Sequence, residues 1–421
     1  MMKTKAIRLR GKCDLRLEEF LLPEMGEDQI LAEVFSNSIC MSSHKAVLQG
    51  SAHKRVHDDI DIHPPIIGHE MCGRILKVGS KWAHKYKAGD RFTMQTALNY
   101  QGTLWAPGYS YEFVGGNATH ILIPNEVMEC DCLLPYKGEA WFYGSLSEPV
   151  SCVVGAFHAN YHTKNGSYVH EMGIREGGKL AIIAGLGPMG LGAIDYALGC
   201  DRKPGLLVVT STKNELIRRA RSIFPEEYAA SQGVKLVYVN TKEQSDPAAY
   251  LLSLTNGAGY DDVFCMAPAQ HLVELSDRIL GRDGCLNFFA GPTDPKFSAH
   301  FNFYNVHYAS THVVGTSGGN TADMREALSM MEQGKINPAS MITHIGGLNV
   351  AADTILNLDK IPGGKKLIYT HKEMPLFAIK DLPELAKTDP FYAGLAEICA
   401  RHKELWSLEA EQYVLANARD I

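Results

Sequence analysis

The sequence has little of what membrane, secreted and nucleic-acid-binding proteins need. Across its 421 residues no apolar run looks long enough to span a bilayer, and the first residues lead directly into a strand-like pattern, so we expect no targeting segment. A net charge of −6 argues against a nucleic-acid binder, because such proteins need a basic surface to displace phosphate counterions. The ten cysteines form no Cys-x-x-Cys pair, which favours reduced thiols over a disulfide framework. We therefore expect a cytoplasmic protein that acts on small molecules and binds neither membrane nor nucleic acid.

Two sequence patterns divide the chain. Up to about residue 149, short strand-like segments alternate with turns, and residues 50–65 form a polar stretch that predicts a long surface loop. From about residue 151, apolar runs alternate with helical stretches, which is typical of a parallel sheet buried on both faces. These runs occupy residues 179–184, 206–210, 235–239, 262–266 and 284–289. We therefore expect an α/β protein with a β-rich domain and a doubly wound parallel-sheet domain.

A glycine motif directly follows the first of these runs and directly precedes a helical stretch. It comprises Gly185, Gly187 and Gly190, with Leu186, Pro188 and Met189 between them. In such a motif the first glycine permits a tight turn, the second lets the backbone approach a pyrophosphate, and the third lets the helix pack closely on the strand. The N-terminus of the helix adds unpaired N–H groups for the anion. The motif therefore predicts a dinucleotide site.

The end of the second apolar run indicates which dinucleotide is bound. NAD-selective sites usually carry an Asp or Glu there, for a hydrogen bond from the ribose. Here the run ends in Ser211 and Lys213 with no acid, and both could receive a 2′-phosphate. Arg218 and Arg219 could add to this charge or belong to a solvated helix face. We expect NADP(H), with NAD(H) as the alternative.

Cys40, His69 and Glu70 are candidate metal ligands. A thiolate, an imidazole and a carboxylate are ligands with which proteins hold catalytic zinc while leaving a position open. Each residue alone would be unremarkable, because a lone cysteine is usually a small buried hydrophobe and a lone histidine a core or surface residue. Their combination with the motifs around them is what makes a metal site the favoured interpretation.

The order of the motifs resembles the zinc-dependent medium-chain dehydrogenases, and among these the polyol dehydrogenases, over about residues 5–370. The motifs are Cys40, Gly68-His69-Glu70, Gly89-Asp90-Arg91-Phe92, Glu148-Pro149 and the glycine motif. Thr316 and Ser317, in a Gly-Thr-Ser-Gly-Gly run, are similar to the family's segment near the nicotinamide ribose. The resemblance implies a GroES-like catalytic domain at 1–155 completed by 318–421, a Rossmann domain at 156–317, substrate in the cleft between them, and a homodimer or homotetramer.

The resemblance also implies a ligand set. It makes Cys40, His69 and Glu70 ligands of one catalytic zinc, with Glu148 where the family places a further ligand or a nearby carboxylate. The choice between the two glutamates stays open. Many relatives hold a second, structural zinc in a four-cysteine loop, but no cysteine occurs between Arg91 and Gly116. We therefore expect one zinc per chain.

The residues after Cys40 depart from the family's Cys-x-Ser/Thr-Asp-x-His pattern. Ser42 keeps the hydroxyl that passes the alcohol proton, whereas Ser43 replaces the aspartate. Lys45 takes the histidine position, with His44 beside it. A histidine side chain is suited to accept a proton near neutral pH, whereas a lysine is not, so Lys45 is favoured as a cation that contacts phosphate. The terminal proton acceptor stays open between His44, Lys45 and solvent.

The substrate follows from resemblance more than from residue chemistry. Lys45 and the 53–57 run, His-Lys-Arg-Val-His, could bind a phosphate, although a solvated loop without a ligand fits the composition equally. The chain is similar to bacterial sorbose-phosphate reductases, which implies an NAD(P)H oxidoreductase that interconverts L-sorbose 1-phosphate and D-glucitol 6-phosphate. The alternatives are a dehydrogenase of an unphosphorylated polyol or secondary alcohol, and a non-catalytic dinucleotide-binding sensor. A zinc-free quinone-type reductase of the same fold would lack the three ligands.

Overall fold

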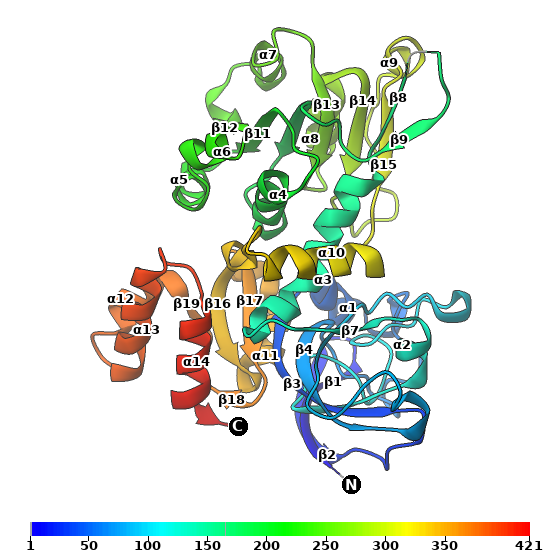
Figure 1. Ribbon diagram of the computed structural model, residues 1–421, viewed down its shortest axis with the longest axis vertical. Coiled ribbons are helices and arrows are strands. Elements are labelled where there is room, and N and C mark those ends of the chain that lie inside the picture. The colour runs from blue at the N-terminus through cyan, green and yellow to red at the C-terminus, as the bar shows by residue number, and fades with distance from the viewer. Residues whose placement is uncertain (1, 165) are drawn as a thin grey trace. The chain divides into compact units, whose positions relative to one another are not determined.

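The chain forms two compact units in a computed structural model that describes residues 2–164 and 166–421. One unit comprises Met1–Glu148 and Ile342–Ile421, and the other comprises Pro149–Met341. The second unit extends beyond the expected limit of residue 317 because α10 (Thr321–Glu332) packs with the preceding helices. His158 Nδ1 lies 2.8 Å from Asp323 Oδ1, and Tyr196 donates a hydrogen bond to Glu326. The chain therefore leaves the first unit once and returns to complete it (Figure 1).

The second unit contains a six-stranded sheet in the order β12-β11-β10-β13-β14-β15, in which every neighbouring pair is parallel. This order starts in the middle of the sheet and changes direction between β10 and β13, which is the doubly wound arrangement. The expected α/β fold is confirmed. The strands are β10 (Lys179–Ile183), β11 (Leu206–Ser211), β12 (Lys235–Asn240), β13 (Tyr260–Cys265), β14 (Leu280–Phe288) and β15 (His312–Gly315).

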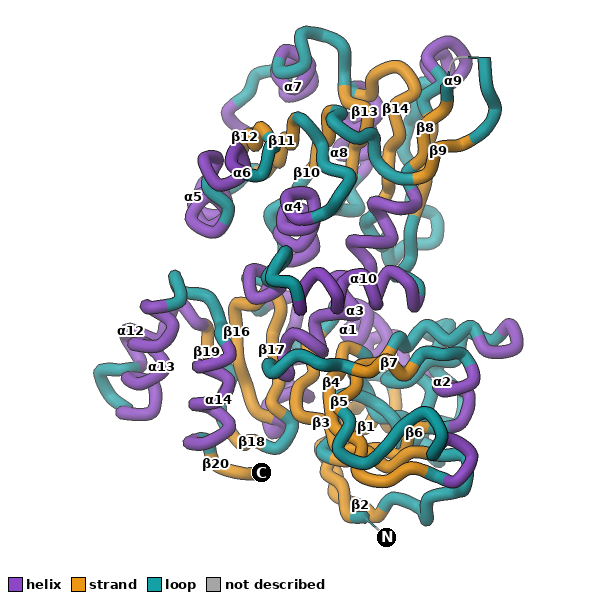
Figure 2. Tube along the Cα trace, in the orientation of Figure 1, coloured by secondary structure: helices purple, strands orange, loops and turns teal. Residues whose placement is uncertain are grey.

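Helices cover this sheet (Figure 2). Its central strands are apolar on both faces, as the uninterrupted apolar runs predicted: Ala181, Val208 and Val263 on one face and Ile182, Val209 and Phe264 on the other have no exposed surface. The other elements are α3 (Trp141–Ala159), which begins in the first unit, β8 (Tyr161–Thr163), β9 (His170–Met172), α4 (Pro188–Gly199), α5 (Asn214–Ile223), α6 (Glu226–Ser231), α7 (Pro247–Ser253), α8 (Gln270–Arg278) and α9 (Phe303–Ala309).

The first unit is built on an eight-stranded sheet in the order β19-β16-β17-β3-β4-β5-β7, with β6 also paired to β3. The C-terminal β17 pairs antiparallel with the N-terminal β3, so the two ends of the chain share one sheet. The strands of this unit are β1 (Lys3–Gly11), β2 (Asp14–Leu21), β3 (Ile30–Ile39), β4 (Glu70–Val78), β5 (Arg91–Met94), β6 (His120–Ile123), β7 (Leu133–Pro135), β16 (Ile342–Gly347), β17 (Lys365–Tyr369), β18 (Lys372–Glu373), β19 (Phe377–Ala378) and β20 (Arg419–Asp420).

The tail after residue 370 packs onto this first unit. Trp406 is 1% exposed, and its indole N–H donates to Tyr369 Oη over 2.7 Å. The buried Glu411 accepts hydrogen bonds from the backbone N–H groups of Trp141 and Phe142, at 2.7 and 2.9 Å, and so holds the first turn of α3. The helices of this unit are α1 (Met41–Gln49), α2 (Asn125–Glu129), α11 (Ala351–Leu356), α12 (Leu382–Leu385), α13 (Pro390–Arg401) and α14 (Leu408–Asn417).

Among the described residues, no helix is both long and apolar enough to cross a membrane.

Candidate functional site

The register of two paired strands brings the predicted metal ligands together. Ser38 of β3 lies opposite Glu70 of β4, so Cys40 at the start of α1 and His69 just before β4 meet at the same edge. The ligand atoms of Cys40, His69 and Glu70 all lie within 4.8 Å of one another. His69 and Glu70 are buried, whereas Cys40 is partly exposed, so one side of the group stays accessible. No other group of this kind occurs within residues 2–164 and 166–421.

Glu70 is held by two residues that sequence reasoning missed. Its Oε1 forms an ion pair with Lys365 Nζ, and its Oε2 accepts a hydrogen bond from Ser38 Oγ. The Lys365 side chain is only 5% exposed, and that of Glu70 is fully buried. The two lysines that begin β17, Lys365 and Lys366, are the signal that could have revealed this pair, because buried lysines need a partner. Both carboxylate oxygens of Glu70 are therefore engaged by the protein itself.

Glu148 lies on α3 beside the same group. Its burial raises its pKa to about 7, against the opposing effect of His69, and Glu70 and Cys40 raise it further. These electrostatic interactions indicate that Glu148 lies near the other three predicted ligands, whereas the group whose ligand atoms all lie within 4.8 Å of one another comprises Cys40, His69 and Glu70. The sequence predicted both glutamates here and could not separate their roles.

His69 is oriented by hydroxyl groups on both sides of its ring. Ser43 Oγ lies 3.2 Å from Nδ1, while Ser42 Oγ and Tyr109 Oη lie 3.4 and 3.3 Å from Nε2. Burial lowers the pKa of His69, which favours the neutral ring that a metal requires. A hydrogen bond at one ring nitrogen typically fixes which nitrogen faces a metal, so Ser43 takes the place of the family's aspartate. A thiol, a neutral imidazole and two carboxyl groups are a donor set that fits zinc.

Ser42 and Tyr109 form a hydrogen-bonded pair next to this donor set. The Ser42 hydroxyl donates to Cys40 Sγ over 3.0 Å and accepts from Tyr109 Oη over 2.8 Å. The Tyr109 ring stacks on that of His69, with 4.8 Å between ring centroids. No motif marked Tyr109, because only the folded loop brings residue 109 to residue 42.

The structure separates His44 from Ser42. The buried His44 ring faces α11, where Nδ1 lies 2.7 Å from the carbonyl oxygen of Ile355 and Nε2 lies 3.9 Å from Asp359. The reason is helical geometry, because residues two positions apart on α1 point about 200° apart. Lys45 is partly exposed and acts electrostatically on His53. His44 is therefore not brought to the predicted proton path.

The glycine motif has the space that a dinucleotide needs. A methyl group at Gly190 would lie 2.1 Å from the Gly185 carbonyl oxygen, and one at Gly185 would lie 2.4 Å from Ile182 Cγ2. A methyl group at Gly187 would meet no atom within 4 Å, so the backbone there is open. Gly187 caps α4, and Pro188 and Met189 form its first turn, which presents N–H groups to the same side. The loop therefore fits a pyrophosphate.

Other predicted dinucleotide contacts lie at the carboxyl ends of the strands. Ser211 ends β11, and the exposed Lys213 caps α5. Arg219 donates to the Ser340 carbonyl oxygen over 3.0 Å, which ties it to another partner. Thr316 and Ser317 follow β15, and Thr316 Oγ1 is buried without a hydrogen-bond partner in the described part of the chain. A buried orphan hydroxyl at this position fits a polar ligand group.

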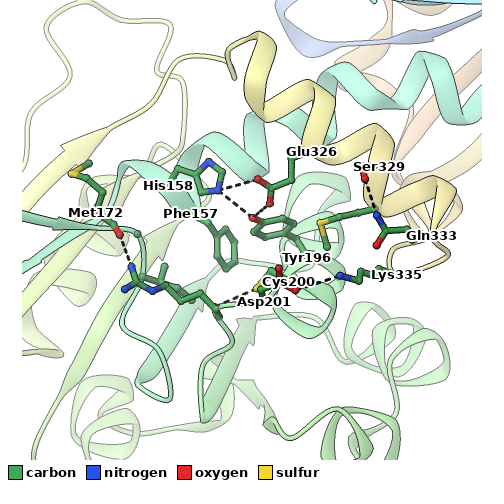
Figure 3. Close-up of a pocket in the computed structure, with 14 residues that line it drawn as sticks. Phe157, His158, Met172, Tyr196, Cys200, Asp201, Glu326, Ser329, Gln333 and Lys335 are labelled. Carbon is green, nitrogen blue, oxygen red and sulfur yellow. Dashed lines mark hydrogen bonds and ion pairs between the residues drawn. The ribbon is translucent and has the colours of Figure 1, made fainter. Parts of the chain in front are cut away.

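A cavity of about 510 Å³ lies at the opposite end of α4 from the glycine motif (Figure 3). Its polar groups pair with one another: Glu326 Oε2 lies 3.3 Å from His158 Nε2, and Lys335 Nζ lies 3.3 Å from Asp201 Oδ1. None of the predicted site residues lines it. We assign no role to this cavity.

The fold and these two sites define a class of protein. Residues 26–131 match the alcohol dehydrogenase GroES-like domain, and residues 188–333 match the zinc-binding dehydrogenase family. The chain belongs to the zinc-binding dehydrogenases, which confirms the family, the fold and the enzyme class expected from the sequence.

Two curated relatives match over nearly the whole chain. The L-sorbose 1-phosphate reductase of Klebsiella pneumoniae is 51% identical, covering 100% of this chain and 99% of the relative. The mannitol-1-phosphate 5-dehydrogenase of Aliivibrio fischeri is 50% identical, covering 99% and 98%. Among solved structures, a zinc-binding dehydrogenase fold from Sinorhizobium meliloti with bound NADP has a TM-score of 0.69 at 19% identity, covering 88% of this chain and 100% of that one. The chain is thus similar to enzymes of sugar and polyol phosphates.

Proposed function

We propose that this protein is a zinc-dependent, NADP(H)-dependent oxidoreductase that interconverts L-sorbose 1-phosphate and D-glucitol 6-phosphate. The observation that carries the proposal is the convergence of Cys40, His69 and Glu70 beside the Ser42 hydroxyl, with Glu148 near enough to interact with them electrostatically, in a chain of the zinc-binding dehydrogenase family. The full-length similarity to an L-sorbose 1-phosphate reductase supports the substrate. Lys213 at the end of β11 and the NADP of the Sinorhizobium structure support the cofactor.

Residues of the first unit have separate roles in the proposed carbonyl reduction. Bound zinc would polarise the substrate carbonyl as a Lewis acid, and the dinucleotide would supply the hydride. Ser42 Oγ is placed to give a proton to the oxygen of the reduced carbon, and Tyr109 Oη, which donates to it, replaces that proton. Solvent is the favoured end of this path, with Lys45 as the alternative, and His44 is left out because its ring faces α11.

We also propose that Cys40, His69 and Glu148 are the zinc ligands, and that Glu70 is an outer carboxylate. Glu70 supports this division because both of its oxygens are already bound, one by Lys365 and one by Ser38. Replacing Glu148 by Gln should then lower zinc affinity more than the same change at Glu70. A larger loss of zinc from E70Q than from E148Q would reverse the assignment.

Mannitol 1-phosphate is a second candidate substrate, because the Aliivibrio mannitol-1-phosphate 5-dehydrogenase is nearly as similar to this chain as the Klebsiella reductase is. In L-sorbose 1-phosphate the phosphate sits on the carbon next to the keto group, whereas the name mannitol-1-phosphate 5-dehydrogenase places reaction at C5 and phosphate on C1. The two substrates therefore differ in how far the phosphate lies from the reacting carbon.

Steady-state kinetics with purified enzyme test the proposal. We expect the highest kcat/KM for L-sorbose 1-phosphate with NADPH, one zinc per chain, and loss of activity on chelation that added zinc restores. In the oxidation direction with NADP⁺, a higher kcat/KM for mannitol 1-phosphate than for D-glucitol 6-phosphate would favour the second substrate. Equal efficiency on L-sorbose and its 1-phosphate would favour the unphosphorylated alternative. Unchanged activity after complete zinc removal would exclude a zinc-dependent enzyme.

A further inference from the structure

A group of basic side chains lies one aromatic ring away from His69. The Tyr109 ring stacks on His69 on one side, and the His53 ring stacks on Tyr109 with centroids 5.9 Å apart and planes 10° from parallel. The Arg55 guanidinium carbon lies 5.8 Å from the centroid of the same tyrosine ring. Lys45, on the first turns of α1, is close enough to act on His53. The basic group, Lys45, His53, Lys54 and Arg55, thus borders the predicted metal site within one unit of the fold.

The segment that carries Arg55 is fixed in place. Arg55 Nη1 donates to the Leu104 carbonyl oxygen over 3.1 Å, and Ser110 Oγ donates to the Arg55 carbonyl oxygen over 2.6 Å. The His57 ring packs on Trp105 with 4.5 Å between centroids. These contacts leave Arg55 partly buried. The guanidinium retains further N–H donors beyond the one bound to Leu104.

The charged groups that act on His53 make the local electrostatic field positive. The pKa of His53 is lowered to about 4 by burial and then by Arg55, Lys54 and Lys45, all of which are cations. Arg55 also acts on His69 and on Tyr109, so its field reaches the predicted metal ligands. A positive field of this kind attracts an anionic group that arrives with the substrate.

We infer that Arg55 and Lys45 form a subsite that binds the phosphate of the substrate while its carbonyl lies at the Cys40–His69 group. This inference rests on the proposed function and adds the residues that select a phosphorylated sugar over a free one. Arg55 offers a planar fork of donors and Lys45 a point charge, and both bind phosphate well in proteins. His53 stays neutral between them and contributes shape and a hydrogen-bonding group.

Substitution of each cation in the zinc-loaded enzyme tests the subsite. Arg55→Gln keeps a donor for the Leu104 carbonyl and removes the charge, and Lys45→Gln removes the other charge. Lys77→Gln is the matched control, because this exposed lysine of β4 lies seven residues from Glu70, about 20 Å along the strand. The readouts are KM and kcat for L-sorbose 1-phosphate, the kcat/KM ratio of that substrate to L-sorbose, and the Kd of inorganic phosphate by calorimetry. Zinc content and melting temperature are measured for every variant.

We expect R55Q to raise KM for the phosphorylated ketose about 10- to 100-fold, the range for loss of charge-assisted hydrogen bonds, with kcat changed much less. The Kd of inorganic phosphate should rise in parallel. K45Q should raise both quantities less than R55Q does, and K77Q should change neither. The subsite is refuted if R55Q and K45Q both leave KM and the phosphate Kd within twofold of wild type. If the wild type reduces no sugar phosphate but binds phosphate in an Arg55-dependent way, the proposed function fails and the subsite stands.

Discussion

The dinucleotide loop takes its three glycines from six consecutive residues, whereas the metal group takes its side chains from the ends of β3 and β4, from α3 and from β17. The loop works through backbone shape, which local sequence sets almost alone. The metal group works through side-chain charge, and each charge depends on a partner far away in the sequence, such as Lys365 for Glu70. The two sites should therefore respond differently to substitution. In the loop the effect depends on the backbone space at each glycine, whereas in the metal group it also depends on partners that are distant in the sequence.

The largest effect is expected from removing the thiol ligand. Cys40→Ser should lower kcat/KM by about a thousandfold or more, because the metal supplies several kcal/mol of transition-state stabilisation. Zinc content should fall well below one per chain by elemental analysis. Cys13→Ser, at an exposed cysteine of the same unit, is the control and should change neither quantity. A C40S enzyme with a full zinc equivalent would remove Cys40 from the ligand set.

The next effect concerns Glu411, the tail residue that holds α3. Burial raises the pKa of Glu411 from 4.5 to about 7. Between those values the folded protein binds more protons than the unfolded chain, so this residue's contribution to stability falls as pH rises from about 5 to 7 and is constant above that range. At 1.36 kcal/mol per pKa unit, the contribution of Glu411 to the free energy of unfolding should fall by about 3 kcal/mol over this pH range.

Glu411→Gln should abolish that pH dependence, and Glu409→Gln, at an exposed glutamate of the same helix, should keep it. Urea unfolding at pH 5, 6, 7 and 8 measures the difference. Tryptophan fluorescence follows the first unit specifically, because all four tryptophans lie there. A wild-type minus E411Q difference that does not change with pH would contradict the raised pKa.

Within the glycine loop, substitutions at Gly187 and Gly190 should affect different properties, NADPH binding in one case and stability in the other. Gly187→Ala adds a methyl group where no protein atom lies within 4 Å, so the protein should fold normally and bind NADPH about 10- to 100-fold more weakly. Gly190→Ala places the methyl group 2.1 Å from a carbonyl oxygen and should cost about 1–3 kcal/mol of stability. NADPH fluorescence titration and thermal melting separate the two effects. A destabilised G187A protein with normal NADPH affinity would overturn this division.

The smallest effect is expected at Lys213. Lys213→Met should lower the ratio of NADPH to NADH efficiency about tenfold, the equivalent of one lost phosphate contact of 1.4 kcal/mol. Lys235→Met is the control, because this exposed lysine begins β12 at the other end of the sheet. Kinetics with both cofactors give the ratio. A wild-type enzyme that strongly prefers NADH would exclude both Ser211 and Lys213 from cofactor selection.

The sequence predicted the strands, the glycine loop and the approach of Cys40, His69 and Glu70, because each has a local signature. It did not predict Tyr109, Ser38 or Lys365, whose roles come from contacts between distant segments. It placed His44 beside the proton path, and the structure turns this ring to α11, since its neighbour Ser42 faces another side of the helix. Sequence proximity is thus a poor guide on a helix, where adjacent side chains diverge.

The amino-acid sequence by itself determined the doubly wound sheet, the dinucleotide motif and the types of metal ligand, because apolar periodicity and glycine spacing act over a few residues. Only the tertiary structure decided that Glu70 is bound on both oxygens, that Glu148 lies beside the same group, and that Arg55 stands one ring from His69. The physical reason is that electrostatic partners are chosen by distance in space, and burial strengthens them wherever the chain brings charges together.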